Sequence, residues 1–355
     1  MISEKVELFQ HRGIDIYRLS DSRVGLDGFL ALTPITPGLM NTAIGGVRNL
    51  SGQGKSPEFA LDLACDLACA MRDKSWAIKG LKIGGAKTVL FGSGKKTPEF
   101  LRAAGASLER FNLRYGTSDL PRYIYSVDVN TSVPDVADMH EGLAYRCWSE
   151  GDPSPETAKG VAASVLAFFS SDLYKKRNER PSVYITGVLG AVGSVIAKHL
   201  WKAGVVVYGK DIVHDPSRIA QAERDGVVML LSDDIPRVDV YVPCAMGGIL
   251  NKKTIPEICA AGIQAVIGSA NCQLEDGDND ALLLHQAGIL YAVDYVVNRG
   301  GLIFVAGQWR LMTEPERAID ETGDEVLSIL ALSRMQNKPT TVVAREYFGK
   351  FQAAG

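Results

Sequence analysis

The stretch that decides the fold is Val183-Tyr184-Ile185-Thr186-Gly187-Val188-Leu189-Gly190-Ala191-Val192-Gly193. An apolar strand runs into three glycines spaced GxxGxxG, and a helix is expected over 194–203. Glycines let the backbone approach a pyrophosphate at a helix N-terminus, where free N–H groups and the helix dipole favour anions. We therefore predict dinucleotide binding in preference to a plain glycine turn. The predicted contacts are Gly187, Gly190, Ala191, Val192 and Gly193.

An acidic residue, Asp211, follows the next expected strand, 205–208. A carboxylate at this point accepts hydrogen bonds from the adenosine ribose hydroxyls and would repel a 2′-phosphate. We therefore expect the cofactor to be NAD and not NADP.

Further apolar runs extend this pattern along the chain. Strands are expected at 238–242, 265–267 and 289–292, which predicts a parallel doubly wound sheet. In the N-terminal half, Ser56-Pro57-Glu58 and Thr97-Pro98-Glu99 are typical helix starts. After the first of these, Phe59, Leu63, Leu67 and Met71 recur every four residues and predict the apolar face of a helix.

The length of 355 residues suggests two domains, at about 100–200 residues each. We predict an α/β fold with an N-terminal α/β substrate and oligomerisation domain and a Rossmann-type NAD-binding domain. The expected bounds are 1–148 plus about 325–355 for the first domain and 149–324 for the second. Two helices are expected after Thr313-Glu314-Pro315, and with no strand between them we expect them to return to the first domain.

Composition excludes several classes of protein. Basic and acidic residues number 38 and 41, a net charge of −3, so no overall field favours nucleic acid or an anionic membrane. No apolar run approaches the roughly 18 residues of a membrane span, and no apolar signal core follows Met1, so we expect a cytoplasmic protein. The histidines are scattered and no CxxC occurs, so no metal site is expected.

Two weaker motifs carry candidate chemistry. Lys87 follows Gly84-Gly85-Ala86 just before an apolar run, and Asp128 follows another apolar run. Alone, the lysine is better explained as solvated and the aspartate as a cap or turn former. Both become candidates for a site only in combination with other motifs.

In that combination the chain resembles the glutamate, leucine, phenylalanine and valine dehydrogenase family over nearly its whole length. The motifs that carry the resemblance are Ala43-Ile44-Gly45-Gly46-Val47-Arg48, Gly84-Gly85-Ala86-Lys87, Asp128-Val129-Asn130-Thr131, Gly151-Asp152-Pro153-Ser154-Pro155-Glu156-Thr157-Ala158-Lys159-Gly160-Val161, Ala191-Val192-Gly193, Pro243-Cys244-Ala245-Met246-Gly247-Gly248, Gly268-Ser269-Ala270-Asn271, and Asp294-Tyr295-Val296-Val297-Asn298 with Gly300-Gly301.

The resemblance implies roles for individual residues. Lys87, with its own pKa lowered so that it is neutral near working pH, would activate a water against the iminium carbon. Asp128 would exchange a proton with the amine. Lys74 would hold the substrate carboxylate with help from Asn298. The resemblance also implies that the substrate is contacted by Ile44, Gly45, Leu302 and Val305. At the cofactor it implies Thr157, Cys244, Ala245, Ala270 and Asn271.

The sequence departs from the family at specific points. One extra residue lies between Lys74 and Lys87, so that Ser75 competes for the anchoring position, and Val127 precedes Asp128 where an acid or a proline is usual. Arg299 stands where a small residue is usual, and it could clash, point away or bind an additional acid.

The resulting hypothesis is an NAD-dependent L-amino acid dehydrogenase acting on an aliphatic, or alternatively aromatic, amino acid. Its partners would be the amino acid or 2-oxo acid and ammonia, and by analogy a homo-oligomer is expected. The alternatives are a specialised imine or 2-oxo acid reductase and a catalytically silent NAD-binding regulator.

Overall fold

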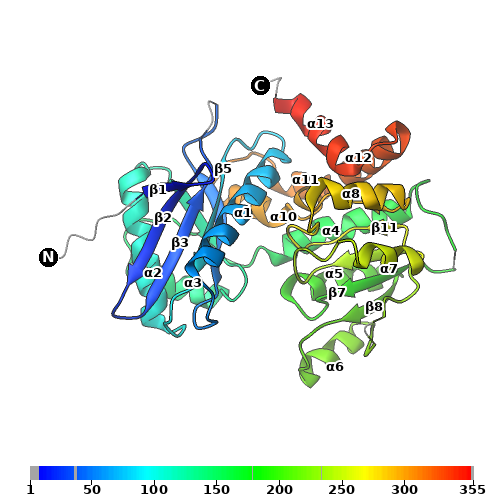
Figure 1. Ribbon diagram of the computed structural model, residues 1–355, viewed down its shortest axis with the longest axis horizontal. Helices are drawn as coiled ribbons and strands as arrows, with labels where there is room; N and C mark the ends of the chain where they lie inside the picture. The colour runs from blue at the N-terminus through cyan, green and yellow to red at the C-terminus, as the bar shows by residue number, and fades with distance from the viewer. Residues whose placement is uncertain (1–7, 36–37, 178, 233, 353–355) are drawn as a thin grey trace. The chain divides into compact units, whose positions relative to one another are not determined.

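The computed structural model describes residues 8–35, 38–177, 179–232 and 234–352. The chain forms two compact units, whose helices and strands are labelled in Figure 1. The first comprises the described residues up to Pro153 together with Val305–Thr313, and the second comprises Ser154–Phe304 with the described residues from Glu314.

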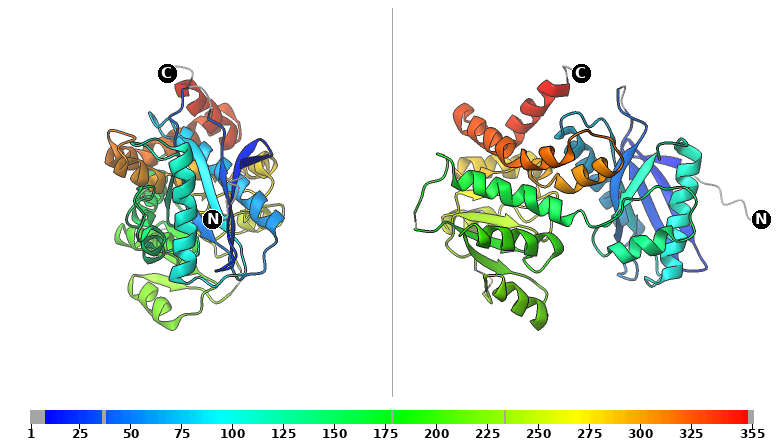
Figure 2. Two further views of the ribbon diagram at one scale, coloured as in Figure 1. Left: turned by 90° about the vertical axis from the view of Figure 1, so that its left-hand side faces the viewer. Right: turned by 180° about the vertical axis from the view of Figure 1, so that it is seen from behind.

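The first unit is built on one mixed sheet with the strand order β1-β2-β3-β5-β4-β6. Its strands are β1 (Leu8–His11), β2 (Ile14–Asp21), β3 (Leu26–Leu32), β4 (Ala43–Asn49), β5 (Gly84–Leu90) and β6 (Tyr123–Ser126). The pairs from β1 to β5 in this order are antiparallel, whereas β4 runs parallel to both β5 and β6. Helix α1 (Pro57–Trp76) covers one face, and α2 (Pro98–Tyr115) with α3 (Val133–His140) covers the other (Figure 2, left).

The two predicted helix starts are confirmed. The hydroxyl of Ser56 accepts a hydrogen bond from the N–H of Phe59 at the start of α1, and Thr97 accepts one from Phe100 at the start of α2. In both helices proline occupies the first turn, where its missing N–H costs no hydrogen bond.

The predicted apolar face of α1 is confirmed in part: Leu67 is buried and Leu63 packs, partly buried, against the core. Phe59 is 47% exposed, and the residues that face the sheet are Ala60, Ala64 and Ala68. The reason is the close approach of the helix to β5: a side chain at Gly85 would collide with the carbonyl of Ala68. Only small residues fit between a helix and a sheet at this separation, so the larger side chains lie along the edge of the contact.

The second unit has the predicted parallel doubly wound sheet. Its strands are β7 (Ser182–Thr186), β8 (Val206–Lys210), β9 (Val227–Met229), β10 (Val240–Pro243), β11 (Ala265–Val266) and β12 (Leu290–Tyr291). Its helices up to β12 are α4 (Ser154–Phe169), α5 (Ala191–Lys202), α6 (Pro216–Arg224), α7 (Thr254–Ala260) and α8 (Gly277–Gln286). Helices α7 and α8 lie in front of the sheet in Figure 1, and α4 and α5 lie in front of it in the view from behind (Figure 2, right).

The strand order β9-β8-β7-β10-β11-β12 is that of a Rossmann fold. Neighbouring strands in this order are parallel. The order reverses between β7 and β10, and ligands of such sheets bind at the carboxyl ends of the strands beside that reversal.

The C-terminal helices differ from expectation. Helices α11 (Pro315–Asp320), α12 (Thr322–Gln336) and α13 (Thr340–Gln352) belong to the second unit and do not return to the first. Helix α12 packs on α4, where an added Cβ at Gly323 would lie 2.9 Å from the carbonyl oxygen of Ala163. The segment that belongs to the first unit is Val305–Thr313, which includes the end of α10 (Gly300–Gln308). None of the described helices is long and apolar enough to cross a membrane.

Candidate active site

Lys87 and Asp128 form an ion pair in the first unit. Lys87 Nζ lies 3.0 Å from Asp128 Oδ2, and the two side chains are 4% and 15% exposed. Strand β5 carries Lys87, and Asp128 follows β6, so residues 41 positions apart in the sequence meet because β4 pairs with both strands. The fold therefore brings together Lys87 and Asp128, although neither motif alone predicts a site.

Arg48 completes this charged group, and no role is predicted for it from the sequence. Its Nε donates to Asp128 Oδ2 at 2.8 Å. Burial opposes ionisation of Asp128, but the charges of Lys87 and Arg48 outweigh it and hold the pKa of this carboxyl well below its usual value. The signal that could have found Arg48 is strand alternation, because residues 46 and 48 of β4 lie on one face.

Gly46 makes room for the ion pair. An added Cβ there would lie 2.7 Å from the Cβ of Asp128 and 3.2 Å from Lys87 Nζ. Ser126 pairs with Gly46 across the parallel β4 and β6, so its side chain is on the same face of the sheet. Its hydroxyl is buried with no hydrogen-bond partner among the residues that the structure describes.

Lys74 is 7% exposed in the last turn of α1, the helix that packs on β5. The competing position, Ser75, is occupied structurally: its hydroxyl donates to the carbonyl oxygens of Arg72 at 2.7 Å and Ile83 at 3.1 Å. Lys74 is therefore the better candidate for the anchoring residue, since the Ser75 side chain already holds the helix end to the following loop.

The remaining residues predicted to meet the substrate are buried. Ile44 and Gly45 lie on β4, and a side chain at Gly45 would collide with the carbonyl of Ala86 on the neighbouring β5. Leu302 and Val305 are buried on α10, the former in the second unit and the latter in the first.

The glycine turn of the second unit fits a dinucleotide. Gly187 has φ 75°, and an added Cβ would lie 2.9 Å from the N atom of Ala245. A side chain at Gly193 would collide with the carbonyl of Gly187. Gly190 is the N-cap of α5, and no side chain caps this helix. The backbone N–H groups of the first turn, which begins at Ala191 and Val192, are therefore left for an anion.

Asp211 is held beside this turn. Its Oδ2 accepts from the N–H of Leu189 at 2.9 Å, and its Oδ1 accepts from Val213 at 3.0 Å. Each carboxylate oxygen has a further lone pair, so both can also accept from ribose hydroxyls.

The other predicted cofactor residues lie at the carboxyl ends of the neighbouring strands. Cys244 and Ala245 follow β10, where the N–H of Cys244 donates to the carbonyl of Thr186 at 2.9 Å. Ala270 donates to the carbonyl of Pro243 at 3.0 Å, which places Ala270 and Asn271 next to them. The structure thus brings together the predicted residues of the switch point.

Asn298 is buried next to this group. Its Nδ2 donates to the carbonyl of Ser269 and to Oδ1 of Asn271, each at 3.0 Å, and to the carbonyl of Ala270 at 3.4 Å. Its Oδ1 has no hydrogen-bond partner among the described residues. Thr157 is in the first turn of α4, and an added Cβ at Gly300 would lie 2.9 Å from its N atom.

Arg299 is buried, at 2% exposure. Its guanidinium forms an ion pair with Glu325 on α12, and its Nε donates to the hydroxyl of Thr322 at 3.4 Å. Of the three options that the sequence leaves open, the structure favours a side chain that points away into the protein.

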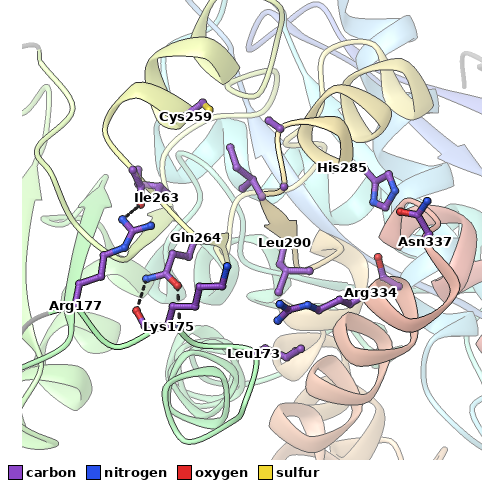
Figure 3. A pocket seen from close by; sticks show the side chains of 15 residues that line it. Leu173, Lys175, Arg177, Cys259, Ile263, Gln264, His285, Leu290, Arg334 and Asn337 are labelled. Atoms are coloured by element: carbon purple, nitrogen blue, oxygen red, sulfur yellow. Dashed lines mark hydrogen bonds between the residues drawn. The ribbon is translucent and has the colours of Figure 1, made fainter.

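A separate pocket of about 440 Å³ lies at the amino ends of strands β11 and β12 in the second unit (Figure 3). It is lined by residues that precede β11 and β12, such as Gln264 and Ile289, whereas the glycine turn follows the carboxyl end of β7. Among its lining residues, the side-chain amide of Gln264 accepts from the backbone N–H of Lys175 at 2.9 Å and donates to the Lys175 carbonyl oxygen at 3.0 Å. This pocket is therefore not the predicted nucleotide site.

No group of three or more metal-ligating side chains occurs in the part of the chain that the structure describes. Cys65 and Cys69, four residues apart on α1, are both free thiols. Burial raises the pKa of Cys65 to about 11, which suits a small apolar residue in the core.

A Rossmann sheet with a glycine turn and a carboxylate held beside that turn, together with a lysine–carboxylate ion pair that is largely buried, defines a two-unit dehydrogenase with a nicotinamide cofactor. A model of the glutamate/leucine/phenylalanine/valine dehydrogenase family matches residues 213–313. The chain is 35% identical over 346 residues to leucine dehydrogenase of Geobacillus stearothermophilus, covering 91% of this chain and 86% of the relative. It is 34% identical over 307 residues to phenylalanine dehydrogenase of Lysinibacillus sphaericus, covering 81% and 74%.

Solved structures agree with these matches. The crystal structure of L-tryptophan dehydrogenase from Nostoc punctiforme superposes with a TM-score of 0.69 at 29% identity, and the match covers 96% of each chain. The chain therefore belongs to the glutamate/leucine/phenylalanine/valine dehydrogenase family of amino acid oxidoreductases.

Proposed function

We propose that this protein is an NAD-dependent L-amino acid dehydrogenase that reversibly converts an aliphatic L-amino acid and water to a 2-oxo acid and ammonia. The observation that carries the proposal is the buried Lys87–Asp128 ion pair, since a protein that only binds NAD has no need of it. When bound, the nicotinamide supplies hydride acceptance from the substrate Cα.

The residues of the first unit supply the proton transfers. Lys87 would act in its neutral form: after it releases to solvent the proton that it holds in the ion pair with Asp128, its Nζ would take a proton from the water that attacks the iminium carbon. The C–N bond then breaks to release ammonia. Asp128 is ionised at neutral pH because Lys87 and Arg48 hold its pKa below the usual value, so it carries no proton of its own and has a lone pair that would take one from the substrate ammonium. Lys74 would hold the substrate carboxylate, and Asn298 would contact the substrate from its buried position.

NAD is the proposed cofactor because Asp211 is fixed at the glycine turn by two backbone N–H groups. A 2′-phosphate would meet this carboxylate and be repelled. The proposed contacts to the rest of the dinucleotide are the glycine turn with Thr157, Cys244, Ala245, Ala270 and Asn271.

An aliphatic side chain is the proposed specificity. Ile44, Leu302 and Val305 are apolar and buried, so a substrate carboxylate packed against them would lose its hydration without gaining a partner, at a cost of several kcal/mol. The alternative is an aromatic substrate, because the relatives include a phenylalanine dehydrogenase and an L-tryptophan dehydrogenase. The volume of Leu302 would, however, crowd a large ring.

A homo-oligomer is also proposed. Strand β1 is at the edge of its sheet and exposes Leu8 and Phe9, an arrangement that favours association with another chain. Light scattering after size exclusion would measure the mass, and a monomer at micromolar concentration would contradict this part.

The test of the function is a panel of kcat/KM values for NAD reduction with leucine, valine, isoleucine, phenylalanine, tryptophan and glutamate. We expect the aliphatic substrates to lead and glutamate to be far behind. No reduction of NAD with any of them would reject the proposal. A leading glutamate, or an aromatic substrate more than tenfold ahead, would reject the aliphatic specificity only.

A further inference from the structure

The buried ion pair between Arg299 and Glu325 lies next to a residue of the proposed substrate site. The two side chains are 3% and 10% exposed, and the arginine is the immediate neighbour of Asn298. An arginine between the asparagine and the following glycine pair is one of the points where this sequence departs from its family. The structure shows that its partner comes from the C-terminal helix α12.

The backbone of the segment that carries Arg299 packs closely against its neighbours. A Cβ at Gly160 of α4 would lie 3.4 Å from the carbonyl oxygen of Val297, and a side chain at Gly300 would collide with the carbonyl of Glu156. Gly323 packs α12 on α4 in the same way. The segment 297–300 is therefore enclosed by α4 and α12, and Arg299 is the side chain that fixes it to α12 by directed hydrogen bonds.

Asn298 depends on that segment for its position. The three hydrogen bonds from its Nδ2 go to residues 269–271, where two of the proposed cofactor contacts lie. Its Oδ1 has no hydrogen-bond partner within the part of the chain that the structure describes. A shift of the 297–300 backbone would break these bonds, because hydrogen bonds weaken steeply with distance and angle.

We propose that Arg299 and Glu325 are positioning residues that set the place of Asn298 for the substrate, acting through the backbone between them. This inference rests on the proposed function only in assigning Asn298 to the substrate. The competing explanation is a purely stabilising ion pair, which would have no effect on catalysis once stability is restored.

The experiment replaces both charges at once, with the variant Arg299→Met/Glu325→Met. Exchanging a buried ion pair for apolar residues of similar volume is often neutral for stability, whereas removing one partner leaves a buried charge unpaired. We expect the double variant to fold with a Tm within about 5 °C of the parent. Its kcat/KM for the amino acid should nevertheless fall by about tenfold or more, with the NADH Kd changed far less.

The same double change in an Asn298→Ala background identifies the route. If the pair acts through Asn298, the further loss in kcat/KM should be within about twofold, because residues that act as a unit are not additive. A full additional tenfold loss would overturn the proposal. The matched control is the exposed pair between Arg317 of α11 and Glu321, which follows that helix, with Arg317→Met/Glu321→Met expected to leave kcat/KM unchanged.

A readout without catalysis separates this inference from the proposed function. Backbone hydrogen exchange over 296–302 should be faster by about tenfold in the Arg299→Met/Glu325→Met variant and unchanged in the α11 control. Unchanged exchange in both would overturn the positioning role even if the enzyme oxidises amino acids. Faster exchange in a protein that oxidises none would reject the proposed function and leave the positioning of Asn298 established.

Discussion

Lys87 Nζ lies 3.0 Å from Asp128 Oδ2, and Arg48 Nε lies 2.8 Å from the same oxygen. One buried carboxylate oxygen thus faces two cations. Desolvation alone would push Asp128 towards its neutral form, and the two charges reverse that tendency. The arrangement links the protonation of Asp128 to both stability and catalysis.

The first prediction concerns acid stability. Because the pKa of Asp128 is lower in the folded than in the unfolded state, where it is about 4, its contribution to stability is present above pH 4. That contribution is lost as the pH falls through the folded-state pKa. Arg48→Gln removes one of the two charges and should raise this pKa, so acid unfolding should begin at higher pH. Circular dichroism across pH 2–6 measures the midpoint of acid unfolding for the variant and the parent.

The control for this change is Arg18→Gln, which breaks a pair with Asp27 whose arginine is 57% exposed. Exposed pairs contribute about 0–1 kcal/mol, so its acid midpoint should stay near that of the parent. Equal midpoints for Arg48→Gln and the parent would show that the charge of Arg48 does not hold Asp128 ionised.

The second prediction uses the space at Gly46. An alanine there would meet the Cβ of Asp128 at 2.7 Å, so Gly46→Ala should displace the carboxylate and lower kcat/KM by about tenfold or more. NADH affinity, measured by fluorescence titration, should be retained because the glycine turn is in the other unit. Gly349→Ala in α13, where an added Cβ meets nothing within 4 Å, is the matched control. Full activity of Gly46→Ala would contradict the geometry.

Local signals predicted the strands, the glycine turn and the capped starts of α1 and α2, because these depend on neighbouring residues in the sequence. The start of α5 at Ala191, three residues before the expected 194, follows from Gly190 acting as N-cap. The buried alanine face of α1 could not be predicted, since it depends on how closely the helix approaches Gly85. Such features depend on contacts between segments that lie far apart in the chain, and a single sequence does not reveal those contacts.

The same reasoning applies to the site. The residues Lys87 and Asp128 are predictable from their motifs, whereas the contribution of Arg48 requires the register of β4 with its neighbours. The C-terminal helices have no strand to show where they pack. Their place in the second unit depends on the contacts of Gly323 and Glu325 with α4 and Arg299.

The third prediction concerns cofactor choice. Asp211→Asn removes the charge but keeps an oxygen that can accept from a backbone N–H. The ratio of kcat/KM for NAD over NADP should be large in the parent and should fall by about tenfold or more in the variant. Initial rates with each cofactor at saturating amino acid give this ratio for the parent and for the variant. Equal use of both cofactors by the parent would refute the role of Asp211.

The fourth prediction concerns the buried hydroxyl of Ser126, which has no partner among the described residues. Ser126→Ala should not lower the free energy of unfolding and should keep kcat/KM for leucine and valine within about threefold. By contrast, Ser75→Ala removes a hydroxyl that donates to two carbonyl oxygens and should cost about 1–2 kcal/mol. Denaturant unfolding compares the two. A loss of leucine activity in Ser126→Ala would show that this hydroxyl contacts the substrate.

We claim that Lys87 is the base of an amino acid dehydrogenase, and the variant Lys87→Ala is the test. The variant should bind NADH as the parent does, and its kcat for the preferred amino acid should fall by about 10²–10⁴, the usual contribution of a positioned acid–base group. Lys82→Ala, an exposed lysine in the preceding loop, should retain full activity. Turnover of Lys87→Ala within tenfold of the parent would contradict the claim.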